Sequence, residues 1–164
     1  MSLIDILLSR RSVRRYERKE IPREVLDKIL EAGRQAPSAG NRQPWHFVVL
    51  IDSEVKKELS KRLFSRFVKD SSVIIVGCAR KGLIAGKWSI ISTAIALQNM
   101  VIAAWALGVG SCWIGDFSEE QVRKLLNIPA SWNVVALVSL GYPAEKPRPR
   151  KRKPLEKIVS FNKF

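Results

Sequence analysis

Apolar side chains spaced three and four residues apart predict two helices near the start of this chain. Residues 21–37 show this spacing, which places the apolar side chains on one face of a helix. Pro22 suits the first turn of that helix, and Pro37 marks its end. Residues 3–9 follow the same pattern over a shorter length. Each helix therefore has one face available for burial.

Continuous apolar runs of strand length alternate with further helical segments. The expected strands are residues 45–52, 71–79 and 133–143, together with a short strand inside 108–115. Helices are expected at 53–64, with Ser53 as the N-cap, and at 118–128. Ser118 and Gln121 have the spacing of a capping box at the start of the second of these helices. The alternation predicts a mixed sheet with helices on its faces.

Residues 88–107 form a helical segment that is apolar nearly all round. Its polar interruptions are Ser92, Thr93, Gln98 and Asn99. They favour a buried core helix over a membrane span. A helix of this kind must be covered on most sides, and so small a chain has little to cover it with. We therefore expect a homodimer.

The length and composition are those of a globular protein. The chain has 164 residues, of which 46% are hydrophobic, and this is enough for a core. No linker or internal repeat interrupts the pattern, so one domain is predicted over residues 1–164. Asp5 and the lack of a small-residue cleavage site argue against a signal peptide, and a cytoplasmic protein is expected.

Positive charge is concentrated at the two ends of the chain. There are 29 basic and 15 acidic residues, a net charge of +14. The two basic clusters are Arg10, Arg11, Arg14, Arg15, Arg18 and Lys19, and Lys146, Arg148, Arg150, Lys151, Arg152 and Lys153. Arginine binds phosphate bidentately, so both clusters would have one purpose if the chain ends converged on a phosphate. A solvated basic surface is the alternative.

Side chains typical of catalysis are sparse. Cys78 and Cys112 have neither CxxC nor metal-ligand spacing, and we expect both to be buried. His46 lies between apolar residues of a predicted strand, so we expect it to be packed rather than to act as a base. These features indicate that a bound cofactor supplies the chemistry. Two loops, “PSAGNRQPW” and “GVGSCWIG”, are flexible enough to approach a ligand closely.

Five motifs together resemble the FMN-dependent nitroreductase family. They are “SRRSVRRY”, “QAPSAGNRQPWHFVV”, “ALQNMVIAAWALGVGSCWIGDF”, “LNIPASW” and “LGYPAEKPRPRKRKPLEKIV”. They occur in the family's order, from about residue 3 to about residue 160. The resemblance implies an α+β fold, with a mixed, largely antiparallel sheet flanked by helices, in a homodimer that binds FMN at the subunit interface.

The resemblance also implies a set of flavin contacts. Four residues of the N-terminal motif match contacts to the phosphate and the ring: Arg10, Arg11, Ser12 and Arg14. Of these, Arg14 is expected near the N1 and O2 edge of the ring. Arg150 and Arg152 match the family's C-terminal basic pair, which closes over the same phosphate.

The remaining implied contacts lie in the two loops. Pro37, Ser38 and Asn41 match the loop that reaches the flavin from the second subunit. The segment from Cys112 to Gly115 matches the loop near the ring's O4 and N5, where Ile114 and Gly115 offer backbone groups.

The activity implied by the resemblance is that of an oxidoreductase. NADH or NADPH delivers electrons through flavin N5 to a nitro compound, a quinone or a similar small acceptor. One alternative is a specialised member of the same family that modifies flavin or acts as a deiodinase or dehydrogenase. The other is a basic nucleic-acid-binding protein, suggested by the pI of about 10.3. No recognised binding motif supports it, so neither nucleic acid nor membrane is expected as a partner.

Overall fold

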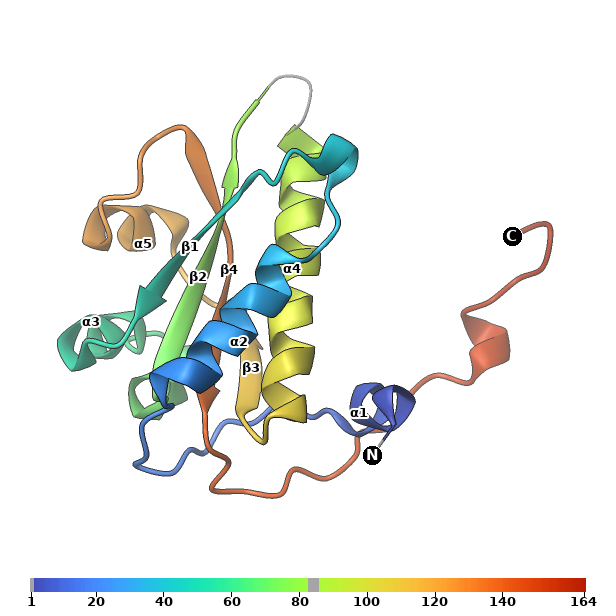
Figure 1. Cartoon of the computed structure of the whole chain (residues 1–164), viewed down its shortest axis with the longest axis horizontal. Coiled ribbons are helices and arrows are strands. Elements are labelled where there is room, and N and C mark those ends of the chain that lie inside the picture. Colours follow the sequence, from blue (N-terminus) through green and yellow to red (C-terminus); the bar gives the residue numbers. More distant parts are fainter. Residues whose placement is uncertain (1, 83–85) are drawn as a thin grey trace.

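The computed structural model describes residues 2–82 and 86–164 and shows one four-stranded sheet with helices on both faces (Figure 1). The strands are β1 (Trp45–Leu50), β2 (Val73–Arg80), β3 (Gly110–Ile114) and β4 (Trp132–Gly141). They lie in the order β1-β2-β4-β3, and neighbouring strands pair antiparallel. An isolated parallel bridge joins Ser12 to Ser111 at the outer side of β3. The predicted α+β class and largely antiparallel sheet are confirmed.

The helices match the expected segments to within a few residues, except that the helix expected over 53–64 ends at Leu59. They are α1 (Leu3–Ser9), α2 (Arg23–Arg34), α3 (Ser53–Leu59), α4 (Gly86–Ala106) and α5 (Glu119–Leu125), with 3₁₀ turns η1 (Ala39–Asn41), η2 (Leu63–Asp70) and η3 (Leu155–Lys157). Ser118 caps α5 as predicted, because its Oγ accepts from the backbone N–H of Gln121 at 3.3 Å. The prediction of Ser53 as a cap was wrong. The Asp52 carboxylate accepts from the N–H groups of Glu54 and Val55 instead, and so Ser53 becomes the first helical residue.

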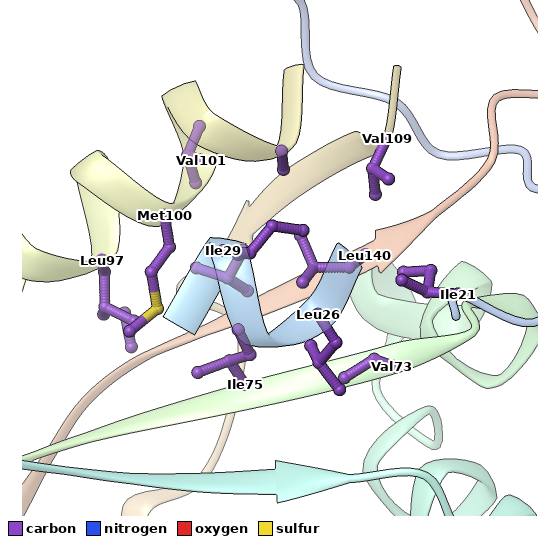
Figure 2. Packing of buried hydrophobic residues seen from close by; sticks show 13 residues of the cluster. Ile21, Leu26, Ile29, Val73, Ile75, Leu97, Met100, Val101, Val109 and Leu140 are labelled. Atoms are coloured by element: carbon purple, nitrogen blue, oxygen red, sulfur yellow. The ribbon is translucent and has the colours of Figure 1, made fainter. Parts of the chain in front are cut away.

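The main core lies between the sheet and the pair of helices α2 and α4. Figure 2 shows Leu26 and Ile29 of α2 packed among Leu97 and Met100 of α4 and Ile75 of β2. A second cluster fills the opposite face of the sheet, beneath α3, η2 and α5. The sheet is therefore covered on both sides, and its central strand β2 is buried along most of its length.

Helix α4 is the longest element and a core helix, as predicted. It is the one helix in the described part of the chain that is long and apolar enough to cross a membrane. Its side chains at Ala96, Leu97 and Met100 are fully buried against the sheet and α2. Other large apolar side chains of α4 remain exposed, among them Trp88 (57%) and Ile95 (38%).

His46 differs from expectation. It is exposed rather than packed, and its ring lies 5.8 Å from the ring of Trp132, measured between centroids. The cause is topological, because β1 is an edge strand and its first residues are only partly covered. The apolar neighbours of His46 in the sequence do not reveal this.

Candidate functional site: an arginine-lined pocket between the two chain ends

Backbone hydrogen bonds hold the N-terminal segment 12–17 between β3 and the chain that follows β4. On one side, the N–H of Val13 donates to the carbonyl of Ser111 at 2.9 Å. On the other side, residues 15–17 pair with residues 142–144. The hydrogen bonds there run from Glu17 N–H to the Tyr142 carbonyl and from Ala144 N–H to the Arg15 carbonyl, both at 2.9 Å. The two basic clusters are thereby brought together.

Tyr16 anchors this segment to the sheet. Its hydroxyl lies 2.7 Å from the carbonyl of Val13 and 2.7 Å from Oγ of Ser139. Burial raises the pKa of Tyr16, so the hydroxyl stays protonated and available for these bonds. The N-terminal segment also lies very close to β3 at Val13. Residue 110 on β3 must be a glycine there, because a Cβ would lie only 2.8 Å from the Val13 side chain.

The two ends of the chain enclose a pocket of about 930 Å³. Six arginines line it: Arg10, Arg11, Arg14, Arg148, Arg150 and Arg152. Ser12 contributes a hydroxyl, Leu7 and Leu8 of α1 an apolar edge, and Glu145 a carboxylate. Six guanidinium groups around one pocket favour binding of an anion, and phosphate in particular, because its geometry suits bidentate contacts.

The spacing of the C-terminal arginines explains why several reach the same pocket. The segment that follows Glu145 has no regular secondary structure, and Pro147 and Pro149 restrict its backbone to extended conformations. Arg148, Arg150 and Arg152 are two residues apart, and side chains at that spacing share one side of an extended chain. Figure 1 shows this segment passing α1 on its way from the sheet.

Burial and the positive charges around the pocket change the pKa of Arg10. Burial lowers the pKa of the Arg10 guanidinium, and the positive charges of Arg152 and Arg11 lower it further. Arg10 and Arg152 come from opposite ends of the sequence and line the same pocket, so the fold creates a repulsion between their two positive charges. An anion bound between them would relieve it.

Arg14 lies at the side of the pocket nearest to η2. Its guanidinium carbon is 6.0 Å from the centroid of the Phe67 ring, in a cation–π arrangement. Arg14 is exposed, so its charge is directed toward solvent and any ligand in the pocket.

Cys112 and Ile114 of β3, and Gly115 directly after it, do not line the pocket. Cys112 is buried behind Ser12. Burial raises the pKa of its thiol, while Arg14, a hydrogen bond with Ser12 and Arg10 partly counteract that rise. Ile114 is buried at the end of the strand. Gly115 is exposed and has open space where a Cβ would stand, which leaves its backbone accessible.

Pro37, Ser38 and Asn41 are far from the pocket within this chain. Figure 1 shows the turn that contains η1 beside the start of α4, whereas α1 lies beside the end of α4. A hydrogen bond of 3.0 Å from Trp105 Nε1 to Ser9 Oγ fixes that second contact. Because α4 has 21 residues, the two regions are separated by about 30 Å along its axis.

Several residues of the pocket region were not predicted as site residues, among them Glu145, Arg148 and Phe67. Glu145 and Arg148 line the pocket, and Phe67 supports Arg14. The two-residue spacing of Arg148, Arg150 and Arg152 was a usable signal for Arg148. No signal in the sequence indicated Phe67, whose role depends on where η2 lies relative to the N-terminal segment.

A second cavity, of about 550 Å³, lies between α3 and α5. Leu59, Phe117 and Val122 form its apolar part, with Lys61 and Lys124 among its charged residues. It contains none of the predicted site residues. Within the described residues, no group of three or more His, Cys, Asp or Glu side chains could hold a metal ion.

The fold is that of an α+β protein in which two segments far apart in the sequence form one arginine-lined pocket. The model of the nitroreductase family matches residues 7–73 and 67–142 of the chain. The chain therefore belongs to the nitroreductase family, as the resemblance predicted.

Individual relatives agree with this assignment. A protein of Methanothermobacter thermautotrophicus, provisionally named NADH dehydrogenase/NAD(P)H nitroreductase, is 36% identical over 92% of this chain and 82% of its own length. The NADH dehydrogenase of Thermus thermophilus is 33% identical over 93% and 92% of the two chains. The structure of an FMN-dependent nitroreductase from Clostridium difficile R20291 matches with a TM-score of 0.89 and 32% identity, over 98% of this chain and 99% of that one.

Proposed function

We propose that this chain is an FMN-dependent oxidoreductase that uses NADH or NADPH to reduce a nitro compound, a quinone or a similar small acceptor. The observation that carries the proposal is the pocket that six arginines from the two ends of the chain line together, among them Arg10 and Arg152. The proposal also follows the names of relatives in the family to which the chain belongs.

The residues of the pocket fit the phosphate end of FMN. A phosphate monoester carries a charge between about −1.5 and −2 at neutral pH, and the guanidinium groups supply matched donors. Arg10, Arg11, Ser12, Arg150 and Arg152 would hold that phosphate, in agreement with their positions around the pocket. The ring would then extend toward Arg14 and β3, where the backbone of Ile114 and the exposed Gly115 could approach it beside Cys112.

Bound flavin would supply hydride and electron transfer through its N5 atom. The contribution of the chain is electrostatic and steric. Arg14 would place positive charge at the N1 and O2 edge, where negative charge is greater in the reduced state than in the oxidised state. The Phe67 ring would restrict the guanidinium to that region.

We further propose that two copies form the complete site as a homodimer. Leu3, Ile4 and Leu8 of α1 are between 61% and 72% exposed, and Trp88 and Ile95 of α4 are also exposed. A second copy would cover this apolar surface.

The same dimer would supply the missing ring contacts. Pro37, Ser38 and Asn41 of the second copy would approach the flavin, since within one chain they lie at the far end of α4. Residues 1–164 are proposed to act as one domain. The two buried free cysteines agree with the reducing cytoplasm.

The first test is the absorption spectrum of the purified protein, recorded under anaerobic conditions before and after adding NADH and then NADPH. The expected result is close to one FMN per chain and bleaching of the flavin bands by at least one donor. A colourless protein that also fails to bind added FMN would overturn the proposal. A yellow protein that neither donor bleaches would favour the specialised flavin reaction. Strong binding to nucleic acid that falls steeply with salt would favour the third candidate.

A further inference from the structure

Glu145 is an unexpected residue in a pocket built to bind an anion. It is the one acidic side chain among the described residues that line the pocket, and it would lie close to the bound phosphate. We propose that Glu145 is a positioning residue, which holds the N-terminal arginines in the arrangement that binds FMN. This inference rests on the proposed function, because it concerns the same pocket.

The geometry of Glu145 supports a positioning role. Its Oε1 atom accepts hydrogen bonds from two consecutive backbone N–H groups, those of Arg14 at 2.6 Å and Arg15 at 3.1 Å. The partners are more than 100 residues away in the sequence. Across residues 2–82 and 86–164, Glu145 forms no ion pair with an arginine side chain. Its contacts are therefore with the backbone that carries the arginines rather than with their charges.

The two hydrogen bonds link both arginine groups of the pocket. Arg14 belongs to the N-terminal group, and Glu145 stands three residues before Arg148, the first arginine of the C-terminal group. The neighbouring hydrogen bond from the Ala144 N–H to the Arg15 carbonyl continues the same ladder. These hydrogen bonds hold the backbone from which both arginine groups project. Less conformational entropy of that backbone is then lost when an anion binds.

The charge balance explains why the pocket tolerates a carboxylate. Six guanidinium groups and one carboxylate leave a formal charge of 6 − 1 = +5. A phosphate of about −2 therefore still enters a positive pocket. A carboxylate oxygen is also a stronger acceptor for backbone N–H groups than a neutral oxygen. Glu145 therefore favours anion binding through its length and its acceptor oxygen, whereas its negative charge opposes anion binding.

Three substitutions separate reach from charge. Glu145→Gln keeps the length and an acceptor oxygen but removes the charge. Glu145→Asp keeps the charge but is one methylene shorter, so the carboxylate no longer reaches both N–H groups. Glu145→Ala removes both properties. Glu17→Ala is the matched control, because it removes one negative charge from the adjoining segment at a residue that does not line the pocket.

The experiment is a titration of each flavin-free variant with FMN and, separately, with pyrophosphate, together with a thermal melt of each unliganded protein. We expect Glu145→Asp and Glu145→Ala to weaken FMN binding about tenfold or more. Glu145→Gln should bind FMN as tightly as the unsubstituted protein or more tightly, and Glu17→Ala should change binding less than about twofold. Pyrophosphate affinities should follow the same order.

Two results would overturn the inference. One is a Glu145→Asp variant that binds normally while Glu145→Gln binds weakly, because charge rather than reach would then matter. The other is equal binding by all four variants. If Glu145→Ala does not fold, the Gln and Asp variants still decide between these outcomes. Failure of the proposed function gives a different result: the unsubstituted protein would bind pyrophosphate but not FMN, and the pyrophosphate series would still test Glu145.

Discussion

The two ends of helix α4 present opposite situations. Beside its C-terminal end, a single chain forms a pocket lined by six arginines. Beside its N-terminal end lies the turn containing Ser38 and Asn41, which does not line that pocket in the described part of the chain. Within that turn, Ser38 Oγ accepts from the backbone N–H of Gln43 at 2.9 Å.

This difference separates phosphate binding from contacts to the flavin ring, which the family resemblance implies as one site. At the proposed site, residues of a single chain bind the phosphate, whereas contacts to the far side of the flavin ring would come from the turn of a second copy. A ligand with only phosphate groups should therefore report on the pocket alone. FMN should report on the pocket and on the dimer. The following predictions use that contrast.

The largest effect is expected when the pocket loses an arginine from each chain end. The double variant Arg10→Ala/Arg152→Ala should bind both FMN and pyrophosphate about a hundredfold more weakly or worse. Each removed charge-assisted hydrogen bond is worth roughly 1.5–3 kcal/mol, and calorimetric titration measures the loss.

The control for this double variant removes the same two charges elsewhere. Arg23 and Arg34 form exposed ion pairs on α2, so Arg23→Ala/Arg34→Ala should bind both ligands almost normally. Equal losses in the two double variants would mean that the net charge of the protein, rather than the pocket, governs binding.

A smaller effect is expected from separating the two copies. Ile95→Glu puts a charge on the exposed apolar surface of α4 and should convert a dimer into a monomer, measured by analytical ultracentrifugation. FMN binding should weaken about tenfold, while pyrophosphate binding changes less than about twofold.

Ile51→Glu is the matched control, since Ile51 is 70% exposed but lies just beyond β1. It should leave both the assembly and the two affinities unchanged. A monomeric Ile95→Glu variant that binds FMN at full strength would contradict the assignment of the turn to a second copy.

The smallest effect concerns tuning of the flavin rather than its binding. Arg14→Gln removes the positive charge that Phe67 supports. Reduced flavin is stabilised by positive charge at the N1 and O2 edge, so the midpoint potential should become more negative, by about 30 mV for a loss of about 1.4 kcal/mol. Potentiometric titration measures the shift. Arg14→Lys keeps the charge and should retain most of the potential, and an unchanged potential in Arg14→Gln would remove Arg14 from this role.

The sequence indicates the arginine pocket better than it indicates the structure that assembles it. Arginine clusters and their spacing are visible in the residue order, because side-chain charge is a local property. The pairing of residues 15–17 with 142–144 is not visible in this way, since it uses backbone groups that every residue carries. Glu145 was overlooked for the same reason, because both of its donors are backbone N–H groups.

The helix and strand segments were predictable from apolar periodicity, and the errors lie where tertiary context decides. His46 has apolar neighbours, but its exposure follows from the edge position of β1. Ser53 and Asp52 are both good caps, and only the structure shows that the carboxylate of Asp52 accepts the first N–H groups of α3. The separation of Asn41 from the pocket depends on the length and direction of α4, which periodicity alone does not give.

Pairing between the first and last parts of the chain also sets an order of events during synthesis. The partners of Arg14 and Arg15 are translated about 130 residues later, which takes roughly 7 to 26 seconds at ordinary rates of elongation. Until then the N-terminal segment can pair only with β3, through Val13 and Ser111, and the arginines of that segment have no counterparts. The pocket therefore cannot form before residues 145–152 have been translated, and at the proposed site flavin can be captured only after that point.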